Sequence, residues 1–185
     1  MFLFPADFEK VVRTDIREII TNSDDTLLTD AEESAISEMK TYLRPRYKLV
    51  DMFISYTTWA AGTYATGSRV IKDGVFYRAL QSTTQTPPGS HWVAGDERIP
   101  YLVLTTINIV MFHLYRRINP RKVPEHVSLA YERAVEWLKD IRKGTADLDV
   151  SLYDTAAGDA NEDGIQDAGQ QITYGSRDIK RNNHF

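Results

Sequence analysis

The stretch that most constrains the fold runs from Trp59 to Trp92, because its pattern differs from that of the sequence on either side. Short apolar runs alternate there with polar residues, and glycines separate the runs. Asp73-Gly74 stands between two such runs, and glycine accepts the positive φ that a tight β-hairpin needs. The flanking segments have helical periodicity instead. The sequence therefore predicts a small all-β module inserted into a helical protein.

Helical stripes of apolar residues precede this module. The first covers residues 5–20, with a break near Thr14-Asp15. Thr29 followed by Glu32 has the pattern of a capping box, which predicts the start of the next helix, and Pro45 predicts its end.

Two more helices are predicted after the module. Residues 100–118 are apolar on more than one side, which is typical of a central helix. Pro124 suits the first turn of the last helix and Gly144 its C-terminal cap. The short connection at residues 119–123 predicts an antiparallel pair.

The predicted fold class is therefore mainly α: a small helical bundle with an inserted small all-β module and an extended C-terminal arm. We assign residues 1–54 and 98–145 to the helical core, 55–97 to the β-module and 146–185 to the arm. The arm has no packing stripe and cannot bury enough apolar surface to fold alone. The two ends of the module must join neighbouring helices, so we expect a flexible linker to replace residues 56–95 without harm.

Composition excludes several classes of protein. The net charge of -4 argues against a general nucleic-acid or membrane-surface binder, and the lack of cysteine excludes disulfide frameworks, zinc fingers and thiol catalysis. No apolar run approaches the roughly 20 residues that span a bilayer, and no signal peptide is evident. We expect a chain that is made in a cytoplasm and has no membrane partner.

Catalytic motifs are missing as well. His113, on the predicted central helix, is best explained as a hydrogen-bonded interior or interface histidine. No histidine has a second ligand at metal-binding spacing, and no nucleophile or phosphate-loop motif occurs. The sequence therefore predicts that the chain is not an enzyme and needs no cofactor.

Two charged clusters each allow two interpretations. The basic cluster at the junction of the last two helices complements a negative helix end, or else contacts an acidic neighbour or DNA phosphates. It comprises Arg116, Arg117, Arg121 and Lys122. The acidic run DANEDGIQD is an acidic linker or a calcium loop, whose oxygen ligands would converge at a glycine turn. The ligands would be Asp159, Asn161, Asp163 and Asp167.

The helical part resembles the head-completion, or head–tail connector, adaptor proteins of tailed bacteriophages. The resemblance rests on Phe4-Pro5-Ala6-Asp7-Phe8, on the helix from Thr29 to Tyr47, on His113 to Pro120 with Tyr131 to Leu138, and on Tyr174 to Phe185. It implies a ring of about twelve copies that docks beneath the portal and extends the DNA channel. The implied partners are further copies, the portal protein, other tail or connector proteins, and packaged DNA contacted without sequence specificity.

The same resemblance implies a place and a contact surface. The place is the head–tail junction of the virion, after synthesis in the host bacterial cytoplasm. The C-terminal arm would contact a neighbouring subunit or the portal, with basic side chains on acidic surface and aromatic ones as apolar anchors. These interface residues are Tyr174, Arg177, Lys180, Arg181 and Phe185.

The inserted module resembles the small chitin- or cellulose-type carbohydrate-binding modules of secreted glycosidases. The pattern that carries this includes Gly62-Thr63-Tyr64, Phe76-Tyr77-Arg78-Ala79 and Pro88-Gly89-Ser90. It implies a glycan partner held by stacking on Trp59, Tyr64, Tyr77 and Trp92. Trp59 and Trp92 can equally be the core of the module, and the segment from Leu80 to Thr84 lacks the aromatic residues of the binding strand.

The function that these patterns favour is that of a structural virion protein, a subunit of a head–tail connector ring. The alternative is a carbohydrate-binding accessory protein that acts through the inserted module. A third hypothesis, a calcium-dependent adhesion fragment, rests on the acidic run alone.

Overall fold

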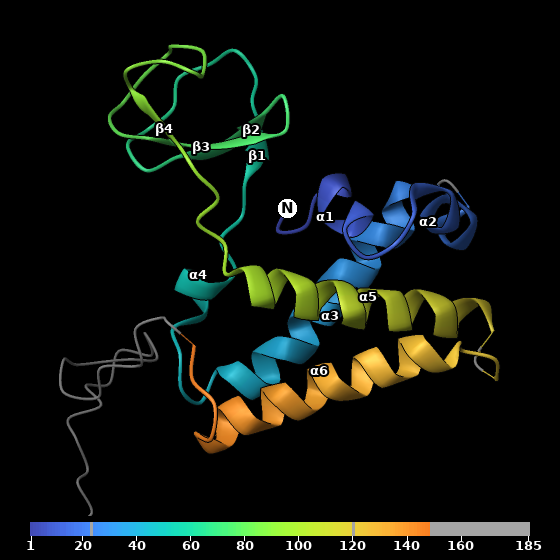
Figure 1. Ribbon diagram of the computed structural model, residues 1–185. Helices are drawn as coiled ribbons and strands as arrows, with labels where there is room; N and C mark the ends of the chain where they lie inside the picture. Colours follow the sequence, from blue (N-terminus) through green and yellow to red (C-terminus); the bar gives the residue numbers. More distant parts are fainter. Residues whose placement is uncertain (23, 120, 149–185) are drawn as a thin grey trace, which may run out of the picture. The chain divides into compact units, whose positions relative to one another are not determined.

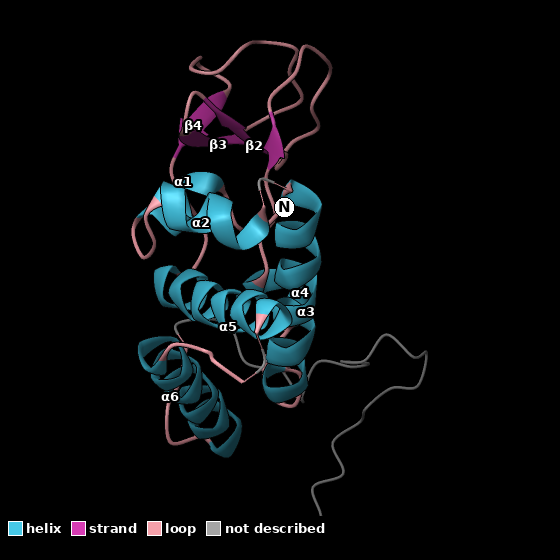
Figure 2. Ribbon diagram, turned by 90° about the vertical axis from the view of Figure 1, so that its right-hand side faces the viewer, coloured by secondary structure: helices cyan, strands magenta, loops and turns pink. Residues whose placement is uncertain are grey.

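The computed structural model describes residues 1–22, 24–119 and 121–148, which lie in one compact unit, Met1–Val150. The helices are α1 (Pro5–Glu9), α2 (Thr14–Thr21), α3 (Asp25–Leu43), α4 (Leu49–Met52), α5 (Pro100–Ile118) and α6 (Glu125–Lys143). The strands are β1 (Thr57–Thr58), β2 (Arg69–Lys72), β3 (Val75–Ala79) and β4 (Trp92–Ala94). All strands fall between α4 and α5 (Figures 1 and 2).

Helix α5 is central, as its apolar sequence predicts. It packs against α3 and α6, and α1 and α2 also contact it. Figure 1 shows α5 and α6 side by side with opposite chain directions, which confirms the predicted antiparallel pair. Leu102, Ile109 and Val110 of α5 are fully buried, and Leu138 and Ile141 of α6 are buried in the same core.

The predicted end of α6 is correct, whereas the predicted start of α3 is wrong. Gly144 caps α6 with a φ of 82°, a value that glycine adopts without strain. Helix α3 begins at Asp25, one turn before Thr29, because the side chain of Asp24 accepts a hydrogen bond from the backbone N–H of Thr26. Glu32 is therefore an interior residue of the helix and not part of a capping box.

The strands form one mixed sheet in the order β1-β2-β3-β4. β1 pairs with β2 in parallel, while β2–β3 and β3–β4 pair antiparallel. The turn between β2 and β3 is the predicted Asp73-Gly74, and both residues have positive φ, 51° and 76°. The sequence thus predicts this hairpin turn correctly.

The predicted fold class is wrong, because the structure is a mixed α/β fold. The sheet is not a separate all-β module attached to a mainly α protein. Phe76 of β3 contacts the rings of Phe4 and Tyr56, with centroid distances of 5.5 and 4.8 Å. The guanidinium of Arg98 lies 4.4 Å from the centre of the Phe76 ring. The sheet and the N-terminal segment therefore share apolar contacts.

The alternation along β3 explains this error. Tyr77 and Ala79 point into the sheet's own small core, together with Val70 and Trp92. Phe76, one residue before Tyr77, belongs to the opposite face of the strand, where it meets the N-terminal segment. An isolated module would turn that face to water. The domain boundaries assigned from the sequence stay a prediction.

Candidate functional site

The aromatic residues predicted to bind a glycan come together, but as the small core of the sheet. Tyr77 and Trp92 are buried, and Trp59 and Tyr64 pack against them half-buried. The indole N–H of Trp92 donates to the carbonyl of Gln85 at 2.8 Å, and the hydroxyl of Tyr64 donates to the carbonyl of Ala60 at 2.8 Å. These rings are used for packing, in agreement with the alternative interpretation of Trp59 and Trp92 as core residues.

The other predicted site residues lie outside the described residues. They are Tyr174, Arg177, Lys180, Arg181 and Phe185 of the predicted interface, and Asp159, Asn161, Asp163 and Asp167 of the predicted calcium loop. In the part of the chain that the structure describes, no cluster of three or more histidine, aspartate or glutamate side chains could hold a metal ion. The calcium hypothesis therefore stays a prediction.

A buried ionic network joins the start of the chain to the start of α5. Arg98 donates to both carboxylate oxygens of Asp7, at 2.7 and 3.1 Å, and also pairs with Asp96 at 2.7 Å. The side chains of Arg98 and Asp7 are only 1% and 3% exposed. Burial lowers the pKa of Arg98, but its bonds with Asp96 and Asp7 outweigh burial and raise that pKa above its usual range.

Glu32 of α3 holds the same segment from a second side. Its Oε1 accepts from the backbone N–H groups of Phe2 and Leu3, at 2.9 and 3.1 Å. These contacts satisfy amides that are buried and have no strand or helix partner. Sequence reasoning missed both Glu32 and Arg98, and the available signal was an acid inside the apolar run FLFPADF, which needs a buried partner.

A second polar cluster joins α3, α5 and α6. Glu38 bonds to His113 Nε2 at 3.1 Å and accepts from the hydroxyl of Tyr131 at 2.8 Å. Burial and then the neighbouring Glu38 raise the pKa of Tyr131 to about 12. His113 is thus the hydrogen-bonded interhelical histidine that the sequence predicts. The cluster stabilises helix packing.

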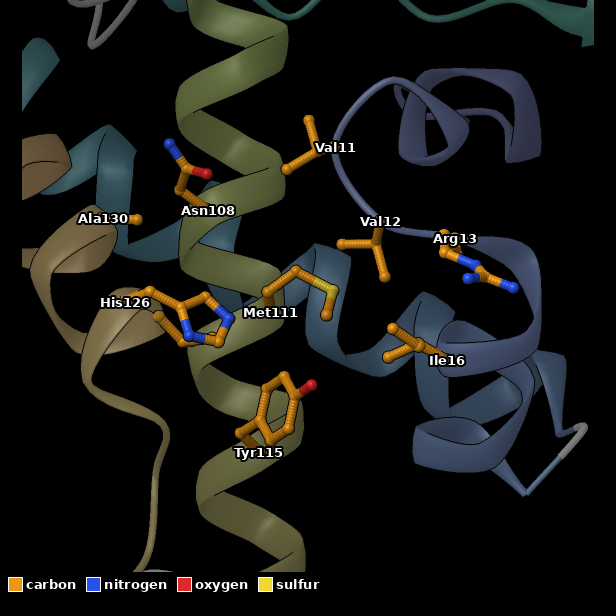
Figure 3. A pocket seen from close by; sticks show the side chains of 10 residues that line it. Val11, Val12, Arg13, Ile16, Asn108, Met111, Tyr115, His126 and Ala130 are labelled. Atoms are coloured by element: carbon orange, nitrogen blue, oxygen red, sulfur yellow. The ribbon is translucent and has the colours of Figure 1, made fainter.

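An apolar concave surface forms a groove between the α1–α2 connection, α5 and the start of α6 (Figure 3). Its apolar lining consists of Val11, Val12, Ile16, Met111, Val127 and Ala130, and its polar lining of Arg13, Asn108, Tyr115 and His126. In Figure 3, Met111 projects from α5 between Val12 and His126. This mainly apolar lining suits the groove to contact with another polypeptide segment.

The predicted basic cluster lies beside one end of this groove. Arg116, Arg117, Arg121 and Lys122 are all exposed, at the end of α5 and in the connection to α6. Arg117 lines a shallow pocket with Asp30 and Ser34 of α3, so it faces a different side of α5 from the groove. Tyr115 and His126, which line the groove, bracket the cluster in sequence.

Comparison with known proteins gives one family. Residues 98–167 match the family model described as Bacteriophage Mu, Gp36. The match covers α5, α6 and the acidic run, somewhat over a third of the chain. It indicates that the chain is a bacteriophage protein. No curated protein and no solved structure matches the chain.

Within residues 1–22, 24–119 and 121–148, no helix is both long and apolar enough to cross a bilayer.

Proposed function

We propose that this chain is a non-enzymatic structural protein of the virion, a subunit of the connector ring at the head–tail junction. The observation that carries the proposal is the match of α5 and α6 to a phage protein family, on the same helices that form one wall of the groove. The family match and the groove thus share helices α5 and α6.

The surface of this unit supports assembly. Ile16 and Ile19 of α2 are 38% and 77% exposed, and Ile118 at the end of α5 is 54% exposed. Exposed apolar side chains gathered near a concave apolar surface are typical of protein–protein contacts. A ring requires two different surfaces on each copy, one that meets the preceding neighbour and one that meets the next. The groove supplies one such surface.

The finer parts of the proposal follow from the resemblance to connector adaptors. The ring, of about twelve copies, docks on the portal and continues the channel for packaged DNA. Tyr174 and Phe185 act as apolar anchors on a neighbouring subunit or on the portal, and the cations between them meet acidic surface.

Native mass spectrometry of the full chain, alone and mixed with the portal protein of the same phage, tests this proposal. We expect either closed rings of the chain alone or a complex with the portal that contains many copies. A chain that stays monomeric at micromolar concentration and does not bind the portal protein would contradict the proposal. Deletion of residues 172–185 should abolish assembly and leave the thermal midpoint of the monomer unchanged within about 2 °C.

A further inference from the structure

The groove has a chemistry that selects its occupant. Six of its ten lining residues are apolar, and none of the ten is a carboxylate. The polar ones are Arg13, Asn108, Tyr115 and His126, all of which can donate hydrogen bonds. A segment that fits must present an apolar side chain to the floor and acceptors or negative charge to these donors.

The margin of the groove adds positive charge. Arg121 and Lys122 lie in the connection that leads from α5 into the groove-lining start of α6, and neither forms an ion pair with any described residue. Between residues 116 and 126 the chain has four cations and a single acid, Glu125. Exposed cations that lack partners attract an acidic segment at long range and orient it on arrival.

The chain itself contains a segment of that composition. Residues 159–167, DANEDGIQD, carry four acids, no cation and one large apolar residue, Ile165. The family match runs without interruption from Arg98 to Asp167, so it includes both the α5–α6 wall of the groove and this segment. The two complementary features belong to the same matched region.

The end of the described chain favours a neighbouring copy as the source of this segment. Leu148 is held at the C-terminal side of α6, where its N–H donates to the hydroxyl of Tyr47 at 3.0 Å. The groove lies at the other end of α6, whose 19 residues span about 28 Å. Ile165 is 17 residues beyond Leu148, a reach of about 60 Å at full extension. Reaching its own groove would require the chain to run back along the whole of α6, whereas the groove of the next copy can lie directly beside Leu148.

We propose that the groove receives residues 159–167 of a second copy of this chain, with Ile165 on its apolar floor and the acids beside Arg13, Arg121 and Lys122. The contact is head-to-tail, because groove and departing chain lie at opposite ends of α6, and such contacts build a ring when the rotation between copies closes. The proposal rests on the proposed ring function and names the contact that builds the ring.

Disulfide trapping tests the contact directly, since the chain has no cysteine of its own. One preparation carries Ile165→Cys, and a second, tagged to differ in mass, carries Ile16→Cys in the wall of the groove. In the control pair, Leu80→Cys, an exposed site one residue after β3, replaces Ile16→Cys. Mild oxidation should give the mixed dimer of the test pair in at least tenfold higher yield than that of the control pair. A chain with both cysteines that links only within itself would overturn the proposal.

Further substitutions test the charge of the acidic segment and the shape of the groove, each beside a control that reveals a loss of folding. Asp163→Asn with Asp167→Asn should weaken ring formation at least tenfold, whereas Asp178→Asn should not. Ala130→Trp fills the groove and should also weaken ring formation at least tenfold. Leu129→Trp, one residue away and outside the groove, is its control. Thermal melts must show that both tryptophan variants stay folded.

The outcomes distinguish this inference from the proposed function. If the asparagine variant forms rings as the wild type does and no mixed dimer is trapped, the groove contact is wrong and the proposed ring is unaffected. A wild type that never assembles contradicts both. If Arg121 and Lys122 bind duplex DNA and the asparagine variant assembles normally, the basic margin serves DNA phosphates and the proposal fails.

Discussion

The two N-terminal helices, α1 and α2, use their apolar residues in opposite ways. Phe8 of α1 is fully buried, and the segment before it, Phe2 to Phe4, is buried as well. On and just before α2, in contrast, Val11, Ile16 and Ile19 are 42%, 38% and 77% exposed. Only Ile20 and Thr21, at the end of α2, are buried. One helix is part of the core, and the other presents apolar surface outward.

Polar contacts account for the difference. The segment at α1 is fixed by Arg98 and by Glu32, which come from distant parts of the chain. Among the described residues, the side-chain bonds of α2 are local or exposed: Arg13 pairs with Asp15, Thr21 donates to the carbonyl of Arg17, and Arg17 donates to the carbonyl of Pro5. The comparison indicates that α1 serves folding, while α2 and the α1–α2 connection expose the apolar surface that our proposal assigns to subunit contact.

The largest effect is expected for Arg98→Met. The substitution leaves the carboxylate of Asp7 buried without its partner, and the loss of one member of a buried pair costs about 3–5 kcal/mol of unfolding free energy. Urea denaturation measures the loss. Lys10→Met is the matched control, because Lys10 also pairs with Asp7, at 3.5 Å, but is 74% exposed. The control should cost less than about 1 kcal/mol. Equal losses in the two variants would show that burial of the network does not fix α1.

This network shows where prediction from the sequence ends. The Asp73-Gly74 hairpin, the Gly144 cap and the buried face of α5 depend on residues a few positions apart, and local patterns located them correctly. Asp7 and Arg98 are 91 residues apart, and their pairing depends on how the segments pack. A local pattern contains no such information, which is why Glu32 was assigned to a helix cap and not to the amides of Phe2 and Leu3.

The next effect concerns replacement of residues 56–95 by a glycine–serine linker, which the sequence alone predicts to be harmless. The structure reverses this expectation, because Phe4 would lose its contact with the ring of Phe76. Re-exposure of a single phenylalanine costs on the order of 2 kcal/mol. The thermal midpoint of the helical protein should therefore fall, as measured by circular dichroism at 222 nm.

The linker variant has a sensitive control. Phe76→Ser in the full chain removes the same ring and keeps the sheet, whose small core lies on the other face of β3. Both variants should lose stability in the α1 region and leave the groove unchanged. A linker variant as stable as the wild type would restore the idea of an independent module.

A smaller effect is expected at high pH from Tyr131. Its folded-state pKa of about 12 lies above the ordinary value of 10, so the folded protein holds the phenolic proton more tightly than the unfolded chain. The resulting stability is complete below pH 10 and is lost as the pH rises toward 12. The difference in unfolding free energy between wild type and Tyr131→Phe should shrink over that interval. Urea melts at pH 9, 10.5 and 11.5 measure it, and a constant difference would contradict the raised pKa.

The smallest effect on stability, and the sharpest test of the comparison, is expected for Ile19→Ala. Because Ile19 is 77% exposed, its truncation should change the unfolding free energy of the monomer by less than about 0.5 kcal/mol. Ile20→Ala, one residue further and 4% exposed, should cost about 2–5 kcal/mol through the cavity that it leaves.

If α2 is a contact surface, Ile19→Ala should affect assembly more than Ile20→Ala does, the reverse of their order for stability. Ile19→Ala should then raise the dissociation constant of the ring about tenfold, since about 1.4 kcal/mol of interface burial is lost. Analytical ultracentrifugation measures this constant, and a ring as tight as that of the wild type would mean that α2 exposes its apolar residues without meeting a partner.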